Sequence, residues 1–145
     1  AFTLIDDSYN ASPASMSAAL TSLGSDPTSG RRVAILADML ELGEAADNLH
    51  RDLVDAVAAA DLGVLIGIGP LMKNLIDAAQ DACPKTDIHH CADAKAASDL
   101  ALTLISDGDL VLVKGSNGMK TSSVVTRLLA AASAPQTQNG GHHAA

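Results

Sequence analysis

Residues 110–129, LVLVKGSNGMKTSSVVTRLL, join a continuous apolar run to an amphipathic segment through a loop with two glycines. The run at 110–113 has no polar residue, which is typical of a strand that is buried on both faces. The apolar residues after the loop recur at helical spacing, at Val124, Val125, Leu128 and Leu129. We therefore predict a strand, a loop and a helix in this order, which is the repeating unit of an α/β fold.

The same unit occurs four more times toward the N-terminus. The other apolar runs lie at residues 2–5, 33–36, 62–66 and 88–91. Each is followed by apolar residues at helical spacing, for example Leu49, Leu53, Val54 and Val57. Five such units predict a doubly wound α/β domain with a mainly parallel sheet. In this architecture ligands bind beyond the carboxyl ends of the strands, so the loops after the strands are the candidate sites.

Composition limits the classes of function. The 145 residues are 48% hydrophobic, enough for one core, and we expect a single domain at residues 1–133 and a disordered tail at 134–145. Nine basic against seventeen acidic residues give a net charge of -8, which disfavours nucleic acid as a partner. No apolar run is long enough to span a bilayer, and the N-terminus lacks a signal-peptide pattern. We expect a cytoplasmic protein without membrane insertion.

The sequence shows no set of residues typical of a metal site or a catalytic triad. Cys83 and Cys91 lack the spacing of metal ligands, and we expect two free thiols with structural roles. We assign no metal to His142 and His143 in the expected tail. The chain begins without methionine, directly on an apolar run, so we expect it to be part of a longer protein.

The loop after the first run, within LIDDSYNASPASM at 4–16, combines three features. Ser12 before Pro13 predicts a helix N-cap. The adjacent carboxylates of Asp6 and Asp7 repel each other unless one turns into the loop and the other outward, toward a cation or a ligand hydroxyl. Tyr9 is one of two aromatic residues in the chain, and it is either a local packing lid or a flat surface for a planar ligand. We favour the ligand.

Two further loops carry polar residues. After the last strand, Lys114 to Gly118 combine glycines with the start of a helix, which favours an anion, although a tight turn with solvated lysines is the alternative. The spacing is not that of a P-loop, because Met119 separates Gly118 from Lys120. After the second strand comes Asp38, and we expect His50, further along, to be a packing histidine rather than a ligand.

Three motifs resemble the C-terminal domain of the Mur ligases: IDDSYNASPASMSAAL at 5–20, LADMLELGE at 36–44 with His50, and LVKGSNGMKT at 112–121. The resemblance covers about residues 2–132 and is greatest to the ligase that adds D-alanyl-D-alanine to UDP-N-acetylmuramoyl tripeptide. It implies peptidoglycan precursor synthesis, in which ATP phosphorylates the tripeptide carboxylate and the dipeptide amine attacks the acyl phosphate. It also implies a central domain that holds ATP and Mg and an N-terminal domain that holds the UDP-sugar, so the isolated chain is expected to be inactive, with no catalytic residue of its own.

The resemblance also implies roles for single residues. Asp7 would meet the nucleotide ribose, and Tyr9 and Asn10 would lie near the adenine or the phosphates. Five residues on two loops would face the dipeptide and the reacting carboxylate: Asp38, Lys114, Ser116, Asn117 and Lys120. Many relatives have an arginine where this chain has Asn117, and its absence removes a bidentate anion contact. Lys114 and Lys120 would then have to suffice.

Two alternatives stay open from the sequence. The first is another Mur ligase or a folylpolyglutamate synthase. The second belongs to a different class, a receiver-like phosphoacceptor signalling domain, which Asp6, Asp7, Asp38 and Lys114 fit superficially. In receivers, however, the acceptor follows the third strand and the lysine precedes a proline, whereas Lys114 precedes Gly115.

Overall fold

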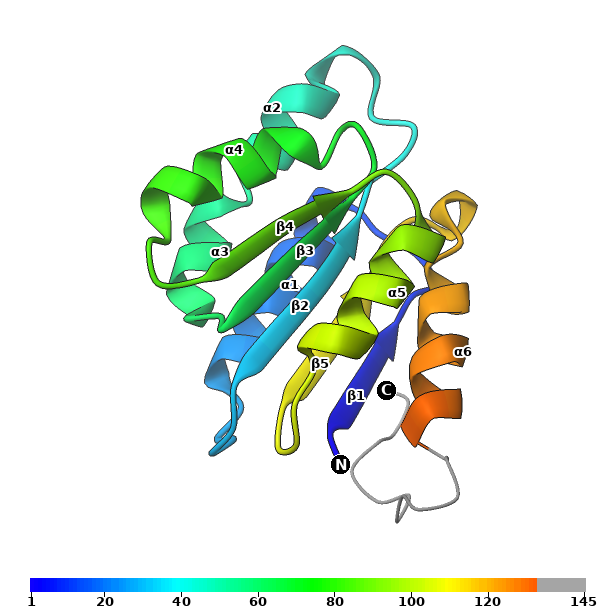
Figure 1. The fold of residues 1–145 in the computed structure, drawn as a ribbon. Helices are drawn as coiled ribbons and strands as arrows, with labels where there is room; N and C mark the ends of the chain where they lie inside the picture. Colours follow the sequence, from blue (N-terminus) through cyan, green and yellow to red (C-terminus); the bar gives the residue numbers. More distant parts are fainter. Residues whose placement is uncertain (133–145) are drawn as a thin grey trace.

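A parallel sheet of five strands runs through the centre of the domain in the computed structural model, which describes residues 1–132 (Figure 1). The strand order is β1-β5-β2-β3-β4, and every neighbouring pair is parallel. The strands are β1 (Thr3–Asp7), β2 (Arg32–Ala37), β3 (Val64–Ile68), β4 (Asp87–Cys91) and β5 (Leu110–Lys114). The expected tail at 134–145, with His142 and His143, lies outside the described residues.

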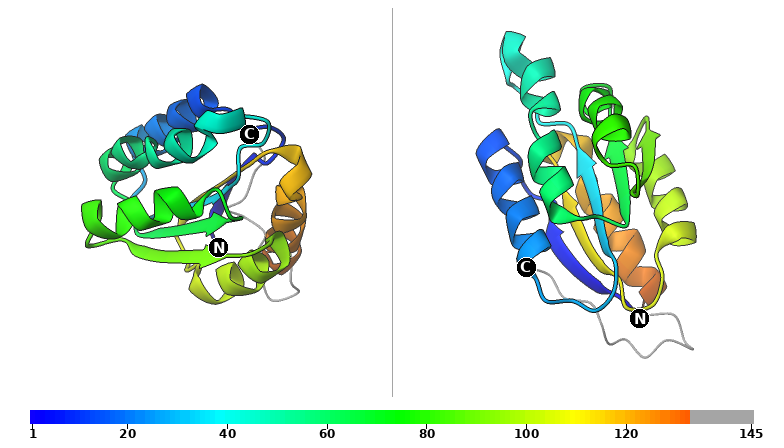
Figure 2. Two further views of the ribbon diagram at one scale, coloured as in Figure 1. Left: turned by 90° about the horizontal axis from the view of Figure 1, so that it is seen from above. Right: turned by 90° about the vertical axis from the view of Figure 1, so that its left-hand side faces the viewer.

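Helices cover both faces of the sheet, as the view from above shows (Figure 2). The first face carries α1 (Pro13–Ser25), α2 (Ala46–Arg51), α3 (Val54–Ala60) and α4 (Lys73–Ala82), and the second face carries α5 (Ala94–Leu104) and α6 (Thr121–Ala132). Two short 3₁₀ turns, η1 (Gly43–Ala45) and η2 (Asn117–Met119), precede α2 and α6. The doubly wound α/β prediction is confirmed.

The apolar runs form the central strands because both of their faces are buried. Ala34 and Leu36 of β2 pack under the helices of the first face, whereas Val33 and Ile35 pack under α5 and α6. A polar residue at any of these positions would lose its hydration in the core. The edge strands β1 and β4 are only partly buried and carry several polar side chains, whereas the central strands carry polar side chains only at their ends, at Arg32 and Lys114.

The winding changes direction at the carboxyl end of β5. This strand lies between β1 and β2, and its chain continues into α6 on the second face. The chains that leave β1 and β2 instead continue into helices on the first face. Loops that diverge from adjacent parallel strands leave a crevice between them, which is where such folds bind ligands.

Several predicted boundaries are wrong in instructive ways. The segment around Leu49 to Val57 forms two helices, and the chain turns between them at Asp52 and Leu53. The periodicity misses this break because Leu53 and Val57 both stay in the core. The first strand extends through Asp7, since the ladder to β5 continues to the Asp7–Lys114 pair. The third strand begins at Val64, although Leu62 before it is buried too.

Both cysteines are free and buried, as expected. Burial raises the pKa of the Cys83 and Cys91 thiols, and the neighbouring Asp93 raises that of Cys91 further. A raised pKa lowers the thiolate fraction and therefore the reactivity, which agrees with a structural role. Within residues 1–132, no helix has the length and apolar character needed to cross a membrane.

Candidate functional site

A partly buried ion pair joins the ends of β1 and β5. The Lys114 ammonium donates to Asp7 Oδ2 at 2.8 Å and to the carbonyl oxygen of Asn10 at 3.0 Å. The Lys114 side chain is 4% exposed, whereas that of Asp7 is 41% exposed. Lys114 therefore holds the β1–α1 loop through two hydrogen bonds and leaves part of the Asp7 carboxylate open to solvent.

Asp6 turns the other way. Its Oδ1 accepts the backbone N–H of Ser8 at 3.0 Å and the Ser8 hydroxyl at 2.5 Å. The two neighbouring carboxylates thus diverge, one into a local turn and the other toward a cation. The predicted divergence is confirmed, and the cation is Lys114 of the same chain.

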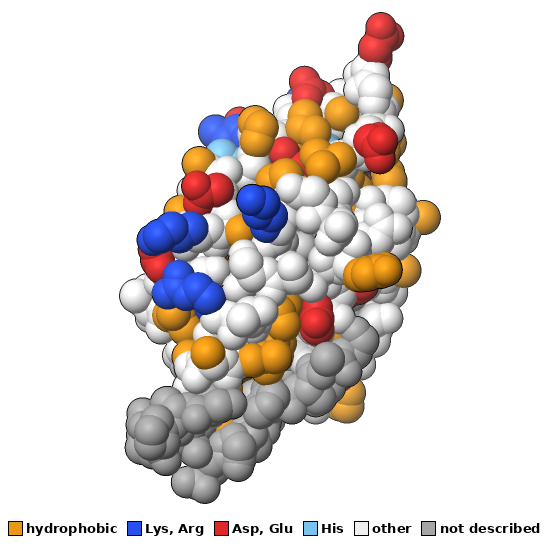
Figure 3. Space-filling model, turned by 90° about the vertical axis from the view of Figure 1, so that its right-hand side faces the viewer, with side chains coloured by type: hydrophobic (Ala, Val, Ile, Leu, Met, Phe, Trp, Pro, Cys, Tyr) orange, Lys and Arg blue, Asp and Glu red, His pale blue; other side chains and the backbone are white. Residues whose placement is uncertain are grey.

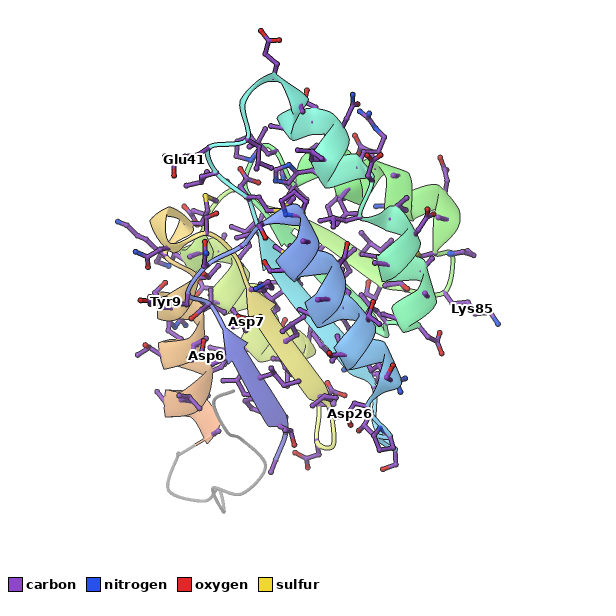
Figure 4. The ribbon with its side chains drawn as sticks, turned by 180° about the vertical axis from the view of Figure 1, so that it is seen from behind. Asp6, Asp7, Tyr9, Asp26, Glu41 and Lys85 are labelled. Carbon is purple, nitrogen blue, oxygen red and sulfur yellow. The ribbon has the colours of Figure 1, made fainter. Side chains whose placement is uncertain are left out.

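Tyr9 projects from the crest of this loop with 82% of its surface exposed, so the packing-lid alternative is wrong (Figure 4). The loop is fixed on both sides of it. On one side the Thr121 hydroxyl donates to the carbonyl of Ser8 at 3.0 Å, and on the other Ser12 forms the predicted N-cap in a capping box with Ser15. The neighbouring Asn10 is also exposed, and its Oδ1 accepts the N–H of Ala11 at 2.8 Å.

Asp38 is built into the framework. It is 2% exposed, and its two carboxylate oxygens accept the N–H groups of Leu71 at 3.1 Å and Met72 at 2.7 Å, at the start of α4. Gly69 makes room for it: this residue has φ +103, and a Cβ there would lie 2.5 Å from the carboxylate. A carboxylate with both oxygens engaged in the interior is not accessible to a phosphoryl donor, so the receiver alternative is excluded.

His50 holds the same loop from the opposite side. The ring is fully buried, and its Nε2 lies 2.9 Å from the N–H of Met39 while Nδ1 lies 2.7 Å from the carbonyl of Ala46. A backbone N–H can only donate, so Nε2 is the acceptor. Nδ1 therefore carries the hydrogen and donates a hydrogen bond to the Ala46 carbonyl. Both ring nitrogens are used by the backbone, and the packing interpretation is confirmed.

The β5–α6 loop connects these two regions. A Cβ at Gly115 would lie 2.6 Å from that of Ala37, so this position requires glycine. The next residue, Ser116, donates its N–H to the carbonyl of Asp38 at 3.3 Å, and its hydroxyl accepts the N–H of Leu40 at 2.9 Å. Asn117 and Lys120 are exposed beyond this anchor, and Lys120 has φ +58, a left-handed conformation that is uncommon outside glycine.

The predicted site residues thus fall into three groups, of which one is the exposed pair Asn117 and Lys120 on the β5–α6 loop. Asp7, Tyr9, Asn10 and Lys114 meet in one loop cluster, and the buried Asp38 and Ser116 support the adjacent loops. Sequence reasoning did not single out Gly69 or the Thr121 hydroxyl, because their importance arises from contacts across the fold. Within residues 1–132, His, Cys, Asp and Glu side chains do not gather in groups of three or more that could hold a metal ion.

Comparison with known proteins is consistent with this geometry. The family model described as "Mur ligase, glutamate ligase domain" matches residues 1–117. The UDP-N-acetylmuramoyl-tripeptide--D-alanyl-D-alanine ligase of Bacillus subtilis is 31% identical over 127 residues, which is 88% of this chain and 28% of that protein. The ligase of the same name from Escherichia coli is 33% identical over 127 residues, which is 86% of this chain and 26% of that protein.

Solved structures share the fold. A crystal structure of MurF from Acinetobacter baumannii has 25% sequence identity and a TM-score of 0.67, and it covers 83% of this chain and 26% of its own. The MurF ligase from Thermotoga maritima, solved in complex with ADP, has 22% identity and a TM-score of 0.65 with the same coverage. The chain therefore spans 26–28% of the length of these relatives.

Proposed function

Because this chain belongs to the Mur ligase family, as its C-terminal or glutamate ligase domain, we propose that it serves an ATP-dependent ligase that joins D-alanyl-D-alanine to UDP-N-acetylmuramoyl tripeptide. The names of relatives at 31–33% identity support this choice over another Mur ligase or a folylpolyglutamate synthase. The partners are the central and N-terminal domains of the same protein. The central domain holds most of ATP and Mg, so the chain alone is inactive, and the use of ATP and a nucleotide-linked precursor indicates the cytoplasm.

The exposed Tyr9 is the observation that carries this proposal. A chain with one tyrosine and one phenylalanine presents its tyrosine to solvent at 82%, on a loop that is anchored on both sides. Such a ring contributes little to the packing of the domain, but it offers a flat apolar surface to a planar base. The open part of the Asp7 carboxylate can accept hydrogen bonds from ribose hydroxyls, and Asn10 lies beside it.

The second loop serves the other reactants. Asn117 and Lys120 face solvent and can meet the dipeptide and the reacting carboxylate. Lys114, Ser116 and Asp38 belong to the same site but act by position: their polar atoms hold the loops that carry Tyr9, Leu40 and Lys120. Closure of the domain over its neighbour would exclude water and align the reactants.

The chain alone should bind nucleotide weakly. One hydrogen bond to a charged group contributes about 1.5–3 kcal/mol and one aromatic contact about 0.5–1.5 kcal/mol, whereas millimolar affinity requires about 4 kcal/mol. We expect calorimetric titration of this chain with ATP to give a Kd no tighter than millimolar. A micromolar Kd would show a complete nucleotide site here and would contradict the proposed division of labour.

The full-length protein provides the direct test. We expect it to consume ATP and join D-alanyl-D-alanine to UDP-N-acetylmuramoyl tripeptide, and not to extend a substrate with glutamate. Tyr9→Ala should raise the KM for ATP about tenfold, the equivalent of 1.4 kcal/mol, while Tyr9→Phe keeps the ring and the KM. A preference for glutamate would refute the substrate assignment, and an unchanged KM in Tyr9→Ala would refute the role of the ring.

A further inference from the structure

Thr121, the first residue of α6, turns its hydroxyl away from its own helix. The side chain is fully buried, and its Oγ1 donates to the carbonyl oxygen of Ser8, 113 residues away in the chain, at 3.0 Å. By contrast, Thr126 of the same helix donates to the carbonyl of Ser122 at 3.0 Å and faces solvent, on the side of the molecule that Figure 3 shows. The Thr121 hydroxyl therefore links α6 to the β1–α1 loop, whereas that of Thr126 stays within the helix.

The orientation of the Thr121 side chain is fixed by its methyl group. A Cβ at Gly115 would lie 2.8 Å from Thr121 Cγ2, so the methyl occupies the space that a side chain at Gly115 would need. Rotation about χ1 is restricted in a β-branched residue, because two heavy atoms are attached to Cβ. With the methyl held beside Gly115, the hydroxyl is directed at Ser8.

The bond to Ser8 acts directly on the backbone of Tyr9. The carbonyl oxygen of Ser8 lies in the same peptide plane as the nitrogen and the Cα of Tyr9, and this plane is rigid. Lys114 donates to the carbonyl of Asn10 at 3.0 Å and therefore holds the next part of the loop, beyond Tyr9. Tyr9 itself makes no hydrogen bond to any residue between 1 and 132, so its position depends on these bonds to its neighbours.

Ser8 offers no other support for this peptide plane. It is 5% exposed, and its N–H and its hydroxyl both donate to Asp6 Oδ1, at 3.0 and 2.5 Å. Its carbonyl has Thr121 as its partner. A carbonyl that is buried without a donor costs free energy, so we expect the Ser8–Tyr9 peptide to turn toward water when the Thr121 hydroxyl is removed. That turn would move Tyr9.

We propose that Thr121 is a positioning residue for Tyr9, and that its hydroxyl holds the Ser8–Tyr9 peptide so that the ring keeps one place at the crest of the loop. Thr121 is fully buried and touches no ligand, so it acts through Tyr9. Its effect on ATP rests on the proposed function, in which the ring meets the base. The start of α6 then fixes the loop of the nucleotide as well as its own.

Nitrogen-15 relaxation of this chain tests the positioning role without a ligand. In the parent chain the backbone order parameter of Tyr9 should be about 0.85, as in rigid backbone. Thr121→Val keeps the shape of the side chain but removes the donor, and the order parameter should fall below about 0.6. Thr121→Ser keeps the donor and should keep most of the order. Thr126→Val is the matched control on the same helix and should leave Tyr9 unchanged.

Kinetics of the full-length protein test whether Thr121 acts through the ring. Tyr9→Ala should raise the KM for ATP about tenfold, and Thr121→Val should raise it about threefold, with Thr121→Ser close to the parent. In the double variant the KM should rise about tenfold and not about thirtyfold, because Thr121 has no ring left to position. Thr126→Val should keep the KM of the parent protein.

A second substitution covers the case in which Thr121→Val does not fold. Thr121→Ala removes the same hydroxyl without placing a second methyl toward Ser8, and it should lower the order parameter of Tyr9 in the same way. A Tyr9 that stays ordered in the variants without the hydroxyl would overturn the inference. A thirtyfold rise of the KM in the double variant would also overturn it, because Thr121 would then act independently of the ring.

Failure of this inference is distinct from failure of the proposed function. If Tyr9→Ala raises the KM for ATP while Thr121→Val changes neither the KM nor the order of Tyr9, the inference alone is wrong. If Thr121→Val lowers the order of Tyr9 in a protein whose KM does not respond to Tyr9→Ala, the positioning role stands and the role of the ring in nucleotide binding is refuted.

Discussion

At the end of β2 the Asp38 carboxylate is 2% exposed and accepts two backbone N–H bonds, whereas at the end of β1 the Asp7 side chain is 41% exposed and meets one lysine. The same residue type therefore has two roles at one edge of one sheet. In the loop after β2, both oxygens of the Asp38 carboxylate are bonded within the fold. In the loop after β1, the fold engages only part of the Asp7 carboxylate, and its exposed part is available to a ligand.

The difference extends to the neighbours of each carboxylate. Around Asp38, His50 is fully buried and bonds Met39 and Ala46, and Ser116 fastens Leu40. Around Asp7, Tyr9 and Asn10 are exposed. Substitutions at the β2 loop should therefore act mainly on stability, and substitutions of the exposed residues of the β1 loop should act mainly on ligand binding. Each prediction below tests one part of that contrast.

The largest effect on stability is expected from His50→Ala. The variant leaves a cavity where the ring was and removes the partners of the Met39 N–H and the Ala46 carbonyl. We expect a loss of about 3–5 kcal/mol in the free energy of unfolding, measured by urea denaturation. Tyr9→Ala is the control and should change it by no more than about 0.5 kcal/mol, because the ring is exposed. Equal losses in the two variants would remove the contrast between the loops.

Asp38→Asn should have the next largest effect. The amide keeps the shape of the side chain, but its NH₂ group replaces one of the two acceptors for the N–H groups of Leu71 and Met72. We expect a loss of about 2–3 kcal/mol in the free energy of unfolding. Asp55→Asn, at an exposed position of α3, is the matched control and should cost no more than about 0.5 kcal/mol. A normal stability for Asp38→Asn would mean that the carboxylate is not needed as a cap.

These two residues also show what the sequence could and could not predict. The α/β fold followed from the apolar runs and helical spacing, since burial on both faces of a strand leaves a pattern in the chain. The packing role of His50 was expected, but its partners were not, because the Met39 N–H and the Ala46 carbonyl become its donor and acceptor only in the folded loop. For Asp38 the residue pattern indicated the position at a strand end but not the burial, which depends on Gly69 and on the start of α4.

In the exposed β1–α1 loop, too, the sequence predicted the conformation of side chains but not their contact partners. Divergence of Asp6 and Asp7 was predictable, because adjacent carboxylates repel. Their partners were not, since Lys114 lies 107 residues from Asp7 and reaches it only through the pairing of β1 with β5. The Asp7–Lys114 contact depends on both the opposite charges and the order of the strands. The residue pattern shows the charges but not the strand order.

A smaller and asymmetric effect is expected at the Asp7–Lys114 pair. Asp7→Asn removes the negative charge opposite a 4% exposed ammonium and leaves only neutral oxygens as its acceptors, and we expect a loss of about 1–2 kcal/mol in the free energy of unfolding. Lys114→Met removes the buried charge and leaves a carboxylate that water can solvate, so its loss should stay under about 1 kcal/mol. Urea denaturation of both variants measures the difference.

The same pair of variants also separates stability from loop order. Lys114→Met removes the bond to the Asn10 carbonyl, so the amides of Tyr9, Asn10 and Ala11 should exchange with solvent faster than in the parent chain. A larger loss of stability in Lys114→Met than in Asp7→Asn would show that the ion pair, and not the burial of the ammonium, determines the cost.

The smallest effect is expected where all partners reach solvent, at Asp99 on α5. Hydrogen bonds from Arg127 and then Lys95 hold the pKa of Asp99 below its ordinary value of 3.8. A lowered folded-state pKa adds stability that is present above the ordinary value and is lost as the pH falls through the lowered one. Arg127→Met should therefore raise the pKa of Asp99, which NMR of the Asp99 carboxyl carbon measures. The variant should also lose less stability than the parent chain as the pH falls. Lys85→Met should leave both unchanged, and an Asp99 pKa that does not respond to Arg127→Met would show that solvent screens this contact completely.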